Sequence, residues 1–187
     1  MEQRIATGNV LIDPQEVLRH ANVGYGETIA DLGTGAMGYF ALQAAKIVGD
    51  RGRVFAVDIM KSALSSLDSR AKLSGIHNIT TVWSNLEVYG GAKMIPNASC
   101  DAAIIVNMLF QSSAKMGNIL KETSRMLKPK GRLLVVDWLK RGSPMGPPLH
   151  LRIDKEQVES AAEAVGFIKE KDFNPGPHHW GILLSKT

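Results

Sequence analysis

The sequence predicts a doubly wound α/β fold built on a seven-stranded sheet, mostly parallel, with an antiparallel C-terminal hairpin strand. Two observations favour this fold. Strand-like and helix-like segments alternate along the 187 residues. Two strand-like segments, residues 102–106 and 133–137, are apolar throughout, which is typical of central parallel strands covered by helices on both faces. The length predicts a single domain over residues 1–187, with a short N-terminal helical extension over residues 1–27.

Seven short segments have the composition of strands and are bounded by Gly, Asp or Asn. The predicted strands cover residues 28–32, 53–57, 79–83, 102–106, 133–137, 167–173 and 179–184. Only a short turn beginning Asn174-Pro-Gly-Pro separates the last two strands. Because so short a connection cannot cross over a sheet, we expect these two strands to be antiparallel.

Helical periodicity fills the gaps between these strands, with apolar residues recurring at every third or fourth position. We expect helices over residues 14–20 and 39–48, a helix ended by Gly75, a helix ended before Pro129, and a helix capped by Asp154. The first of these begins with Asp13 and Pro14, which are favoured at the N-cap and at the first helical position.

The composition is that of a folded globular protein, with 44% hydrophobic and 21% charged residues. The single cysteine, Cys100, excludes an internal disulfide and a Cys/His zinc cluster, so we expect no metal site and a reducing, cytoplasmic location. We expect neither a signal peptide nor a membrane span, because charges interrupt every apolar run well short of about 20 residues. A net charge of +4 permits RNA as a partner without requiring it.

The most informative segment is a glycine-rich loop after the first predicted strand. Gly33, Gly35 and Gly38 form a G-x-G-x-x-G pattern, in which the backbone can turn tightly and approach a ligand closely. Asp58 ends the next predicted strand, twenty residues after Gly38. An acid at that position can accept hydrogen bonds from both hydroxyls of a ribose. The pair of features predicts a site for an adenosine ribose.

The charge beside this loop bears on which ligand carries the ribose. Asp31 lies two residues before the first glycine, where its carboxylate would repel the pyrophosphate of NAD. The ammonium group at the amino-acid end of S-adenosylmethionine suits that carboxylate better. One alternative is NAD, and another is that Asp31 caps the loop while the glycines only turn the chain.

Four stretches together resemble class I S-adenosylmethionine-dependent methyltransferases. They are Asp31-Leu-Gly-Thr-Gly, Val54-Phe-Ala-Val-Asp-Ile, Cys100-Asp-Ala-Ala-Ile-Ile-Val-Asn and Leu127-Lys-Pro-Lys-Gly-Arg-Leu-Leu-Val-Val-Asp. The resemblance covers roughly residues 25–187 and is closest to a small, generic group similar to ubiquinone-biosynthesis methyltransferases. It implies a Rossmann-like sheet and S-adenosyl-L-methionine as cofactor.

The resemblance also implies positions for the parts of the cofactor. Asp31 would lie near the ammonium, Asp58 would hold the ribose, and Ile59 would lie against the adenine. The loop residues implied in cofactor binding are Gly33, Thr34, Gly35 and Gly38.

Three further positions come from the resemblance. Asn85 stands where the family usually has an aspartate for the adenine amino group, and Leu86 would supply the adjacent backbone donor. Asn107 ends the fourth predicted strand, where the methyl group should emerge. The turn before the fifth strand has Lys130 in place of a glycine, a departure that should concern only the turn.

The sequence assigns no catalytic residue. Methyl transfer from a sulfonium is an in-line displacement that depends mainly on holding the acceptor in position. Phe110, Gln111 and Asp137 could border the acceptor, and His179 could act as a base or a wall. Each residue also has an ordinary structural explanation. Phe110 and Gln111 could simply lead into a helix, Asp137 could cap the loop that follows it, and His179 could lie on a surface hairpin.

Three functions therefore stand as hypotheses. The first is a methyltransferase acting on a small molecule. The second is a methyltransferase acting on RNA or protein. The third is a non-catalytic module that binds S-adenosylmethionine or another nucleotide. The sequence leaves open the acceptor atom, the oligomeric state, and whether the loop over residues 142–150 covers the site.

Overall fold

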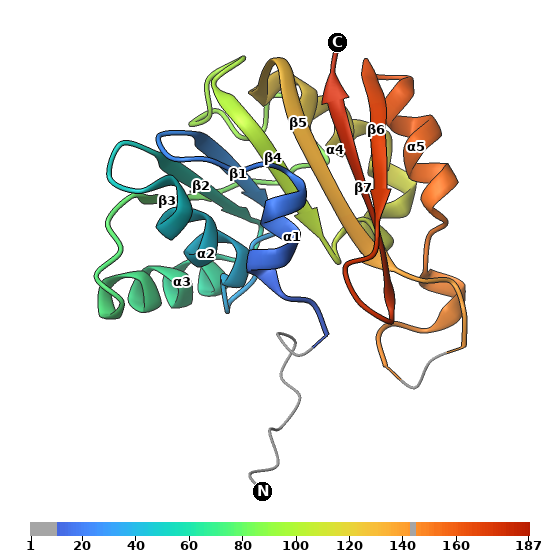
Figure 1. The fold of residues 1–187 in the computed structure, drawn as a ribbon, viewed down its shortest axis with the longest axis horizontal. Helices are drawn as coiled ribbons and strands as arrows, with labels where there is room; N and C mark the ends of the chain where they lie inside the picture. The colour runs from blue at the N-terminus through green and yellow to red at the C-terminus, as the bar shows by residue number, and fades with distance from the viewer. Residues whose placement is uncertain (1–10, 143–144) are drawn as a thin grey trace, which may run out of the picture.

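The computed structural model describes residues 11–142 and 145–187 of the protein. Its strands are β1 (Thr28–Leu32), β2 (Arg53–Asp58), β3 (Ile79–Trp83), β4 (Cys100–Val106), β5 (Leu127–Trp138), β6 (Phe167–Phe173) and β7 (His179–Lys186). They form one sheet in the order β3-β2-β1-β4-β5-β7-β6 (Figure 1). The five strands β1 to β5 are parallel, whereas β7 runs antiparallel to both of its neighbours. The predicted mixed sheet is confirmed.

The fifth strand is longer than predicted, because it begins at Leu127, directly after a helix. Leu127 pairs with Cys100, and a bulge follows before regular pairing resumes. Within the bulge, Lys130 has φ +62°, a left-handed conformation that favours glycine. The structure therefore gives the physical reason why the motif that this turn resembles has glycine there.

The helices are α1 (Pro14–His20), α2 (Tyr39–Val48), α3 (Lys61–Leu73), α4 (Met116–Met126) and α5 (Lys155–Glu163), with short 3₁₀ segments η2 (Leu109–Lys115) and η3 (Leu149–Leu151). The side chain of Asp13 accepts a hydrogen bond from the N–H of Gln15 at 2.8 Å, which starts α1 as predicted. Asp154 and Gln157 form a reciprocal capping box at the start of α5.

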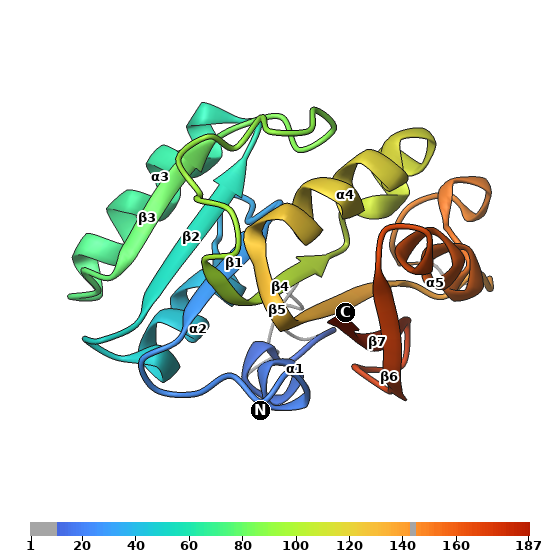
Figure 2. The same ribbon diagram turned by 90° about the horizontal axis from the view of Figure 1, so that it is seen from above.

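The helices cover the two faces of the sheet in unequal layers (Figure 2). One face packs against α1, α2 and α3, through residues such as Leu18, Ala44 and Leu67. The other packs against α4 and α5. On that second face a loop, residues 84–99, takes the place of a helix between β3 and β4 and buries Ala92 and Ile95 in the core.

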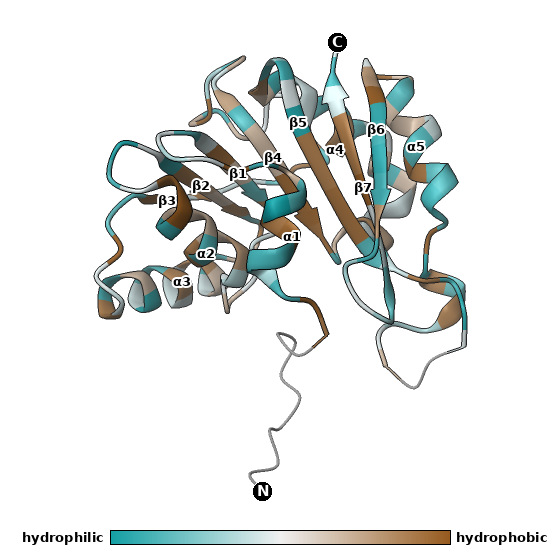
Figure 3. Cartoon of the chain, in the orientation of Figure 1, coloured by the Kyte–Doolittle hydropathy of each residue, from teal (hydrophilic) through white to brown (hydrophobic). Residues whose placement is uncertain are grey.

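Hydropathy follows this layering (Figure 3). The central strands are apolar, whereas the edge strand β6 is largely hydrophilic and exposed. Charged residues on an edge strand hinder pairing with another chain. Across residues 11–142 and 145–187, every helix is too short or too polar to cross a bilayer.

The strand order also decides where a ligand can bind. The chain leaves β1 towards β2 and β3 on one side, and returns to β4 and β5 on the other. Doubly wound sheets bind ligands at such a switch point, beyond the carboxyl ends of the strands. Two expectations extend past the described part: residues 1–10 of the predicted extension and residues 143–144 of the 142–150 loop lie outside it.

Candidate functional site

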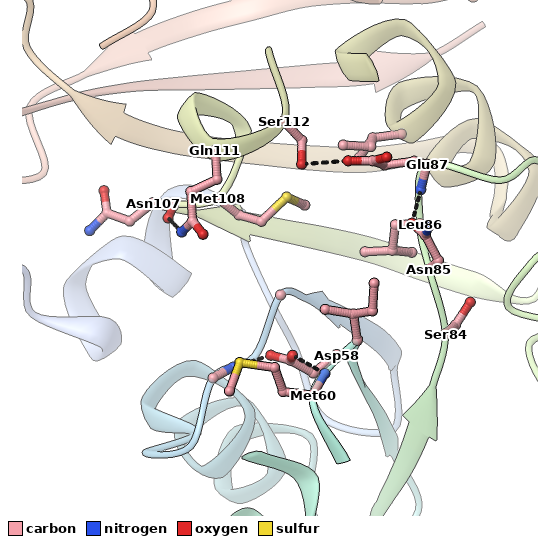
Figure 4. A pocket seen from close by; sticks show the side chains of 14 residues that line it. Asp58, Met60, Ser84, Asn85, Leu86, Glu87, Asn107, Met108, Gln111 and Ser112 are labelled. Carbon is pink, nitrogen blue, oxygen red and sulfur yellow. Dashed lines mark hydrogen bonds between the residues drawn. The ribbon is translucent and has the colours of Figure 1, made fainter. Parts of the chain in front are cut away.

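A pocket of about 380 Å³ opens at the switch point, at the carboxyl ends of β1, β2 and β4. The loop after β3 and the segment η2 form its other walls. The lining residues are Gly33, Gly35, Asp58, Ile59, Met60, Ser84, Asn85, Leu86, Glu87, Asn107, Met108, Gln111, Ser112 and Ile119. In Figure 4, Asp58 and Met60 lie on one side of the pocket, and Glu87, Met108 and Ser112 lie opposite.

Asp58, at the end of β2, is the carboxylate on the side of the pocket formed by β1 and β2. One carboxylate oxygen accepts a hydrogen bond from the N–H of Gly35 at 2.9 Å, and the other accepts from the N–H of Met60 at 2.8 Å. A carboxylate has about four acceptor positions. Asp58 therefore ties the glycine loop to the end of β2 and still has acceptor positions for two hydroxyl groups.

The three glycines of the loop are needed for two reasons: one leaves space in the pocket, and two allow close packing against neighbouring side chains. Gly35 has φ +66°, and a Cβ built there would meet nothing within 4 Å, so its backbone borders open space in the pocket. A Cβ on Gly33 would come within 2.7 Å of the Cγ of Met108. Gly38 faces away from the pocket: a Cβ there would lie 2.3 Å from Leu67, so this glycine lets α2 and α3 pack closely.

Asp31 lies behind the glycine loop, and only 3% of its surface is exposed. Its carboxylate accepts a hydrogen bond from the hydroxyl of Thr34 at 2.6 Å. Burial, with a smaller contribution from the nearby charge of Asp58, raises the pKa of Asp31 to about 6. Neither Asp31 nor Thr34 lines the pocket, so a direct contact between Asp31 and a ligand stays a prediction. A positive group in the pocket would favour the ionised carboxylate.

The wall next to β3 combines an apolar surface with backbone and amide groups. The side chain of Ile59 is 59% exposed at the rim, where a flat ring could lie against it. The amide oxygen of Asn85 accepts a hydrogen bond from the N–H of Glu87 at 2.9 Å. A carbonyl oxygen has two lone pairs, so Asn85 keeps one acceptor position.

The wall opposite Asp58 is formed by the residues that follow β4, and hydrogen bonds from η2 hold it in place. Asn107 has φ +53°, and its side-chain oxygen is buried without a partner in the described structure. The side chain of Gln111 donates to the carbonyl of Asn107 at 3.3 Å. The hydroxyl of Ser112 donates to the carboxylate of Glu87 at 2.8 Å and joins the two walls (Figure 4).

The structure thus gathers most of the residues predicted to bind a cofactor. Those that line the pocket are Gly33, Gly35, Asp58, Ile59, Asn85, Leu86 and Asn107. Sequence reasoning missed Met60, Ser84, Glu87, Met108, Ser112 and Ile119. Several of these residues are direct sequence neighbours of predicted ones, so their positions could have been predicted. The hydrogen bond between Ser112 and Glu87 could not be predicted from the sequence, because it joins segments 25 residues apart.

Of the residues predicted near an acceptor, only Gln111 lines this pocket. Asp137 is fully buried and accepts hydrogen bonds from the N–H groups of Phe110 at 3.2 Å and Trp138 at 2.8 Å. Burial raises the pKa of Asp137 to about 6. It anchors the turn into η2, which follows β4, and not only the loop after β5 that its alternative role as a cap names.

The surface-hairpin alternative for His179 is wrong. Only 2% of His179 is exposed, and its ring packs against Trp138 with centroids 4.1 Å apart and the ring planes tilted by 42°. Burial lowers the pKa of His179 to about 4. The turn of the hairpin is polar, whereas the start of β7 is buried beneath its neighbours.

Comparison with known families decides between the ligands considered for this pocket. A family model described as a methyltransferase domain matches residues 25–171. The chain belongs to the class I S-adenosylmethionine-dependent methyltransferases. S-adenosylmethionine is therefore the cofactor that its family implies, and the family resemblance drawn from the sequence is confirmed.

Relatives of this methyltransferase domain agree with the match. A ubiquinone/menaquinone biosynthesis C-methyltransferase from Enterobacter sp. is 32% identical over 137 residues, which cover 72% of this chain and 50% of the relative. The same enzyme from Haemophilus ducreyi is 30% identical over 122 residues, covering 64% of this chain and 44% of the relative. The chain spans about half the length of these curated relatives.

Solved structures show the same Rossmann-like fold. A SAM-dependent methyltransferase from Aquifex aeolicus superimposes with a TM-score of 0.86 and 24% identity, covering 96% of this chain and 92% of that one. A putative type 11 methyltransferase from Sulfolobus solfataricus gives a TM-score of 0.75 and 26% identity, covering 94% and 93%.

The pocket of this methyltransferase domain fits the cofactor of its family. Gly35 borders open space that a side chain would fill, so its backbone can lie against a ligand. Asp58 has acceptor positions for ribose hydroxyls. Carboxylates at the site match the positive charges of an ammonium and a sulfonium.

Proposed function

We propose that this protein transfers a methyl group from S-adenosylmethionine to a small-molecule acceptor. The observation that carries the proposal is the carboxylate of Asp58, held at the end of β2 by the N–H groups of Gly35 and Met60. The cofactor supplies an electrophilic methyl group: a lone pair of the acceptor forms the new bond to carbon while the carbon–sulfur bond breaks, and its electrons stay on sulfur.

The residues of this chain bind and orient in this proposal. Asp58 accepts hydrogen bonds from the two ribose hydroxyls, and Ile59 covers one face of the adenine. Asn85 keeps an amide lone pair for the adenine amino group, and the backbone N–H of Leu86 donates to the ring. Asp31, behind the loop, favours the ammonium end. Such positioning accounts for much of the rate of a bimolecular displacement.

The proposal of a small acceptor rests on the relatives, whose name is that of quinone-biosynthesis methyltransferases. Neither alternative, an RNA or protein acceptor or a module without activity, gains support from the residues that the structure describes. We further propose a cytoplasmic location, because a chain with one cysteine suits a reducing compartment.

The test is transfer of a labelled methyl group from S-adenosylmethionine into fractionated cell extract. We expect label in the small-molecule fraction and at least a tenfold loss with Asp58→Asn, which loses a charge-assisted contact. Glu156→Gln is the matched control, because Glu156 is an exposed carboxylate on α5, remote from the pocket. Label that enters only RNA or protein, or no transfer with any fraction, would contradict the proposal.

A further inference from the structure

A second pocket lies at the same edge of the sheet, between the end of β5 and the hairpin of β6 and β7. It has a volume of about 370 Å³ and is lined by Leu139, Arg141, Phe173, Pro177 and His179, among others. His179 pairs with Trp138 across β5 and β7, and β5 pairs with β4. Two strand spacings, about 10 Å in all, therefore separate His179 from the end of β4.

The same spacing relates the two pockets. Asn107 directly follows β4 and lines the cofactor pocket, and β5 lies between β4 and the hairpin strand that contributes His179 to the second pocket. A molecule of one or two rings placed between them can have one end in the second pocket and its reacting atom near Asn107.

The second pocket carries uncompensated positive charge. The guanidinium of Arg141 donates to the carbonyl of Pro177, and no carboxylate of the described residues forms an ion pair with it. The one carboxylate in the lining, Asp172, is already paired with Lys155 at 3.1 Å and Lys169 at 3.2 Å. A ligand with a negative group therefore finds a cation without a competing acid.

A buried guanidinium next to the pocket adds to this charge. Arg152 is only 4% exposed, and it donates hydrogen bonds to four carbonyl groups of the 139–152 loop. Its guanidinium carbon lies 5.7 Å from the ring centroid of Trp138. Carbonyl groups satisfy its donors without cancelling its charge, so the positive potential persists at the edge of the pocket.

The remaining walls are flat, apolar, or short of a partner. Phe173 stacks on His20 with centroids 4.2 Å apart, and Pro177 and Leu139 add apolar surface. His179 is nine-tenths buried, and neither of its ring nitrogens has a hydrogen-bond partner among the described residues. A buried imidazole without partners is unusual, and an oxygen atom of a ligand would supply one.

We propose that this second pocket holds the methyl acceptor and that the acceptor is a flat organic anion, such as an aromatic carboxylate or phenolate. Arg141 binds the negative group, and the ring lies between Phe173, Leu139 and Pro177. The inference rests on the proposed function for its catalytic meaning, but binding of the anion can be measured without the cofactor.

The test compares two probes with the same ring, 4-hydroxybenzoate and the neutral 4-hydroxybenzyl alcohol, by ligand-observed NMR titration. We expect the unaltered protein to bind the carboxylate at least tenfold more tightly. Arg141→Gln should abolish that preference, and Arg141→Lys, which keeps the charge, should retain part of it. Lys140→Gln is the matched control, because Lys140 is paired with Asp154 and should leave the preference unchanged.

Two outcomes would overturn the inference: equal or absent binding of both probes by the unaltered protein, or a preference that survives Arg141→Gln. Titration with S-adenosylhomocysteine separates this failure from a failure of the proposed function. We expect Arg141→Gln to leave that affinity unchanged. If the unaltered protein does not bind S-adenosylhomocysteine, the proposed function is contradicted, and the result of the anion titration still stands.

Discussion

Two loops border the two pockets, and they are held by buried charges in different ways. The 84–99 loop, beside the cofactor pocket, is held by Glu122 of α4. Its carboxylate accepts from the N–H groups of Gly90 at 2.6 Å and Ala92 at 3.1 Å, and it pairs with Arg125 at 2.8 Å. Arg125 also donates to the carbonyl of Ile95 at 2.8 Å. This loop is therefore held by an ion pair, Glu122 with Arg125, that has no net charge.

The 139–152 loop, beside the second pocket, is held by a cation alone. Arg152 donates to the carbonyls of Leu139, Arg141, Met145 and Pro147 at 2.7 to 2.9 Å. None of the described carboxylates forms an ion pair with it.

The difference teaches how one sheet edge can serve two ligands of opposite charge. Around the cofactor pocket, Arg125 neutralises Glu122. The carboxylates there that form no ion pair with a described residue are those of Asp31, Asp58 and Glu87, which suit a cationic ligand. Around the second pocket, the unpaired charges are those of Arg141 and Arg152, which suit an anion. The loops therefore fix local structure and leave opposite charges beside the two pockets, which are the two ends of one site in our proposal.

The largest effect is expected from breaking the neutral pair. Glu122→Ala leaves the guanidinium of Arg125 buried without its partner, and removing one member of a buried pair typically costs about 3 to 5 kcal/mol. We expect a loss of that size in the free energy of unfolding, measured by urea denaturation. The double variant Glu122→Leu/Arg125→Met should recover much of it. A single-variant loss below about 1 kcal/mol would show that the pair does not hold the loop.

Breaking the lone cation should cost a similar amount. Arg152→Met leaves four carbonyls without donors, and at about 0.5 to 1.5 kcal/mol for each hydrogen bond we expect a loss of about 2 to 6 kcal/mol. Arg152→Lys keeps the charge but has fewer donors, so it should recover only part of the stability. Equal stability of the methionine variant and the unaltered protein, measured in urea, would contradict this role.

A matched pair of glycine substitutions separates backbone strain from binding. Gly35 and Gly26 both have positive φ, and a Cβ on either meets nothing within 4 Å. Alanine at either position should cost about 1 to 2 kcal/mol of stability. Only Gly35→Ala places its methyl group in the pocket, so it alone should weaken S-adenosylhomocysteine binding, by at least tenfold in calorimetry. Similar weakening by Gly26→Ala would mean that strain, and not contact, explains the loss.

The smallest effect concerns pH. Because burial raises the pKa of Asp31 to about 6, its ionised form, which attracts an ammonium, predominates at pH 7, is half populated near pH 6 and is largely lost at pH 5. We expect the affinity for S-adenosylhomocysteine to fall about tenfold between pH 7 and pH 5. Asp31→Asn should flatten that dependence, and methylthioadenosine, which lacks the ammonium, should not show it. A similar fall for both ligands would point to another titrating group.

The cofactor half of the site could be predicted from sequence, because its features are local. Glycines close to the end of a strand and an acid such as Asp58 at the end of the next strand obey spacing rules that a single chain displays. The exposed Ile59 follows directly from the position of Asp58.

The second half could not be predicted, because its features depend on tertiary packing. Nothing near His179 in the sequence shows that Trp138, 41 residues earlier, covers its ring. Likewise, the four carbonyls that hold Arg152 are brought together only by the folded loop. The same limit applies to Asp137, whose role in anchoring Phe110 requires β5 and η2 to meet.

The central claim is that the pocket at the ends of β1, β2 and β4 binds S-adenosylmethionine through Asp58. The most direct measurement is calorimetric titration of the unaltered protein and the Asp58→Asn variant with S-adenosylmethionine, S-adenosylhomocysteine and NAD. We expect saturable binding of the two adenosyl-sulfur ligands, at least tenfold weaker in the variant, and none of NAD. Binding of NAD alone, or equal binding of the sulfur ligands by both proteins, would contradict the account.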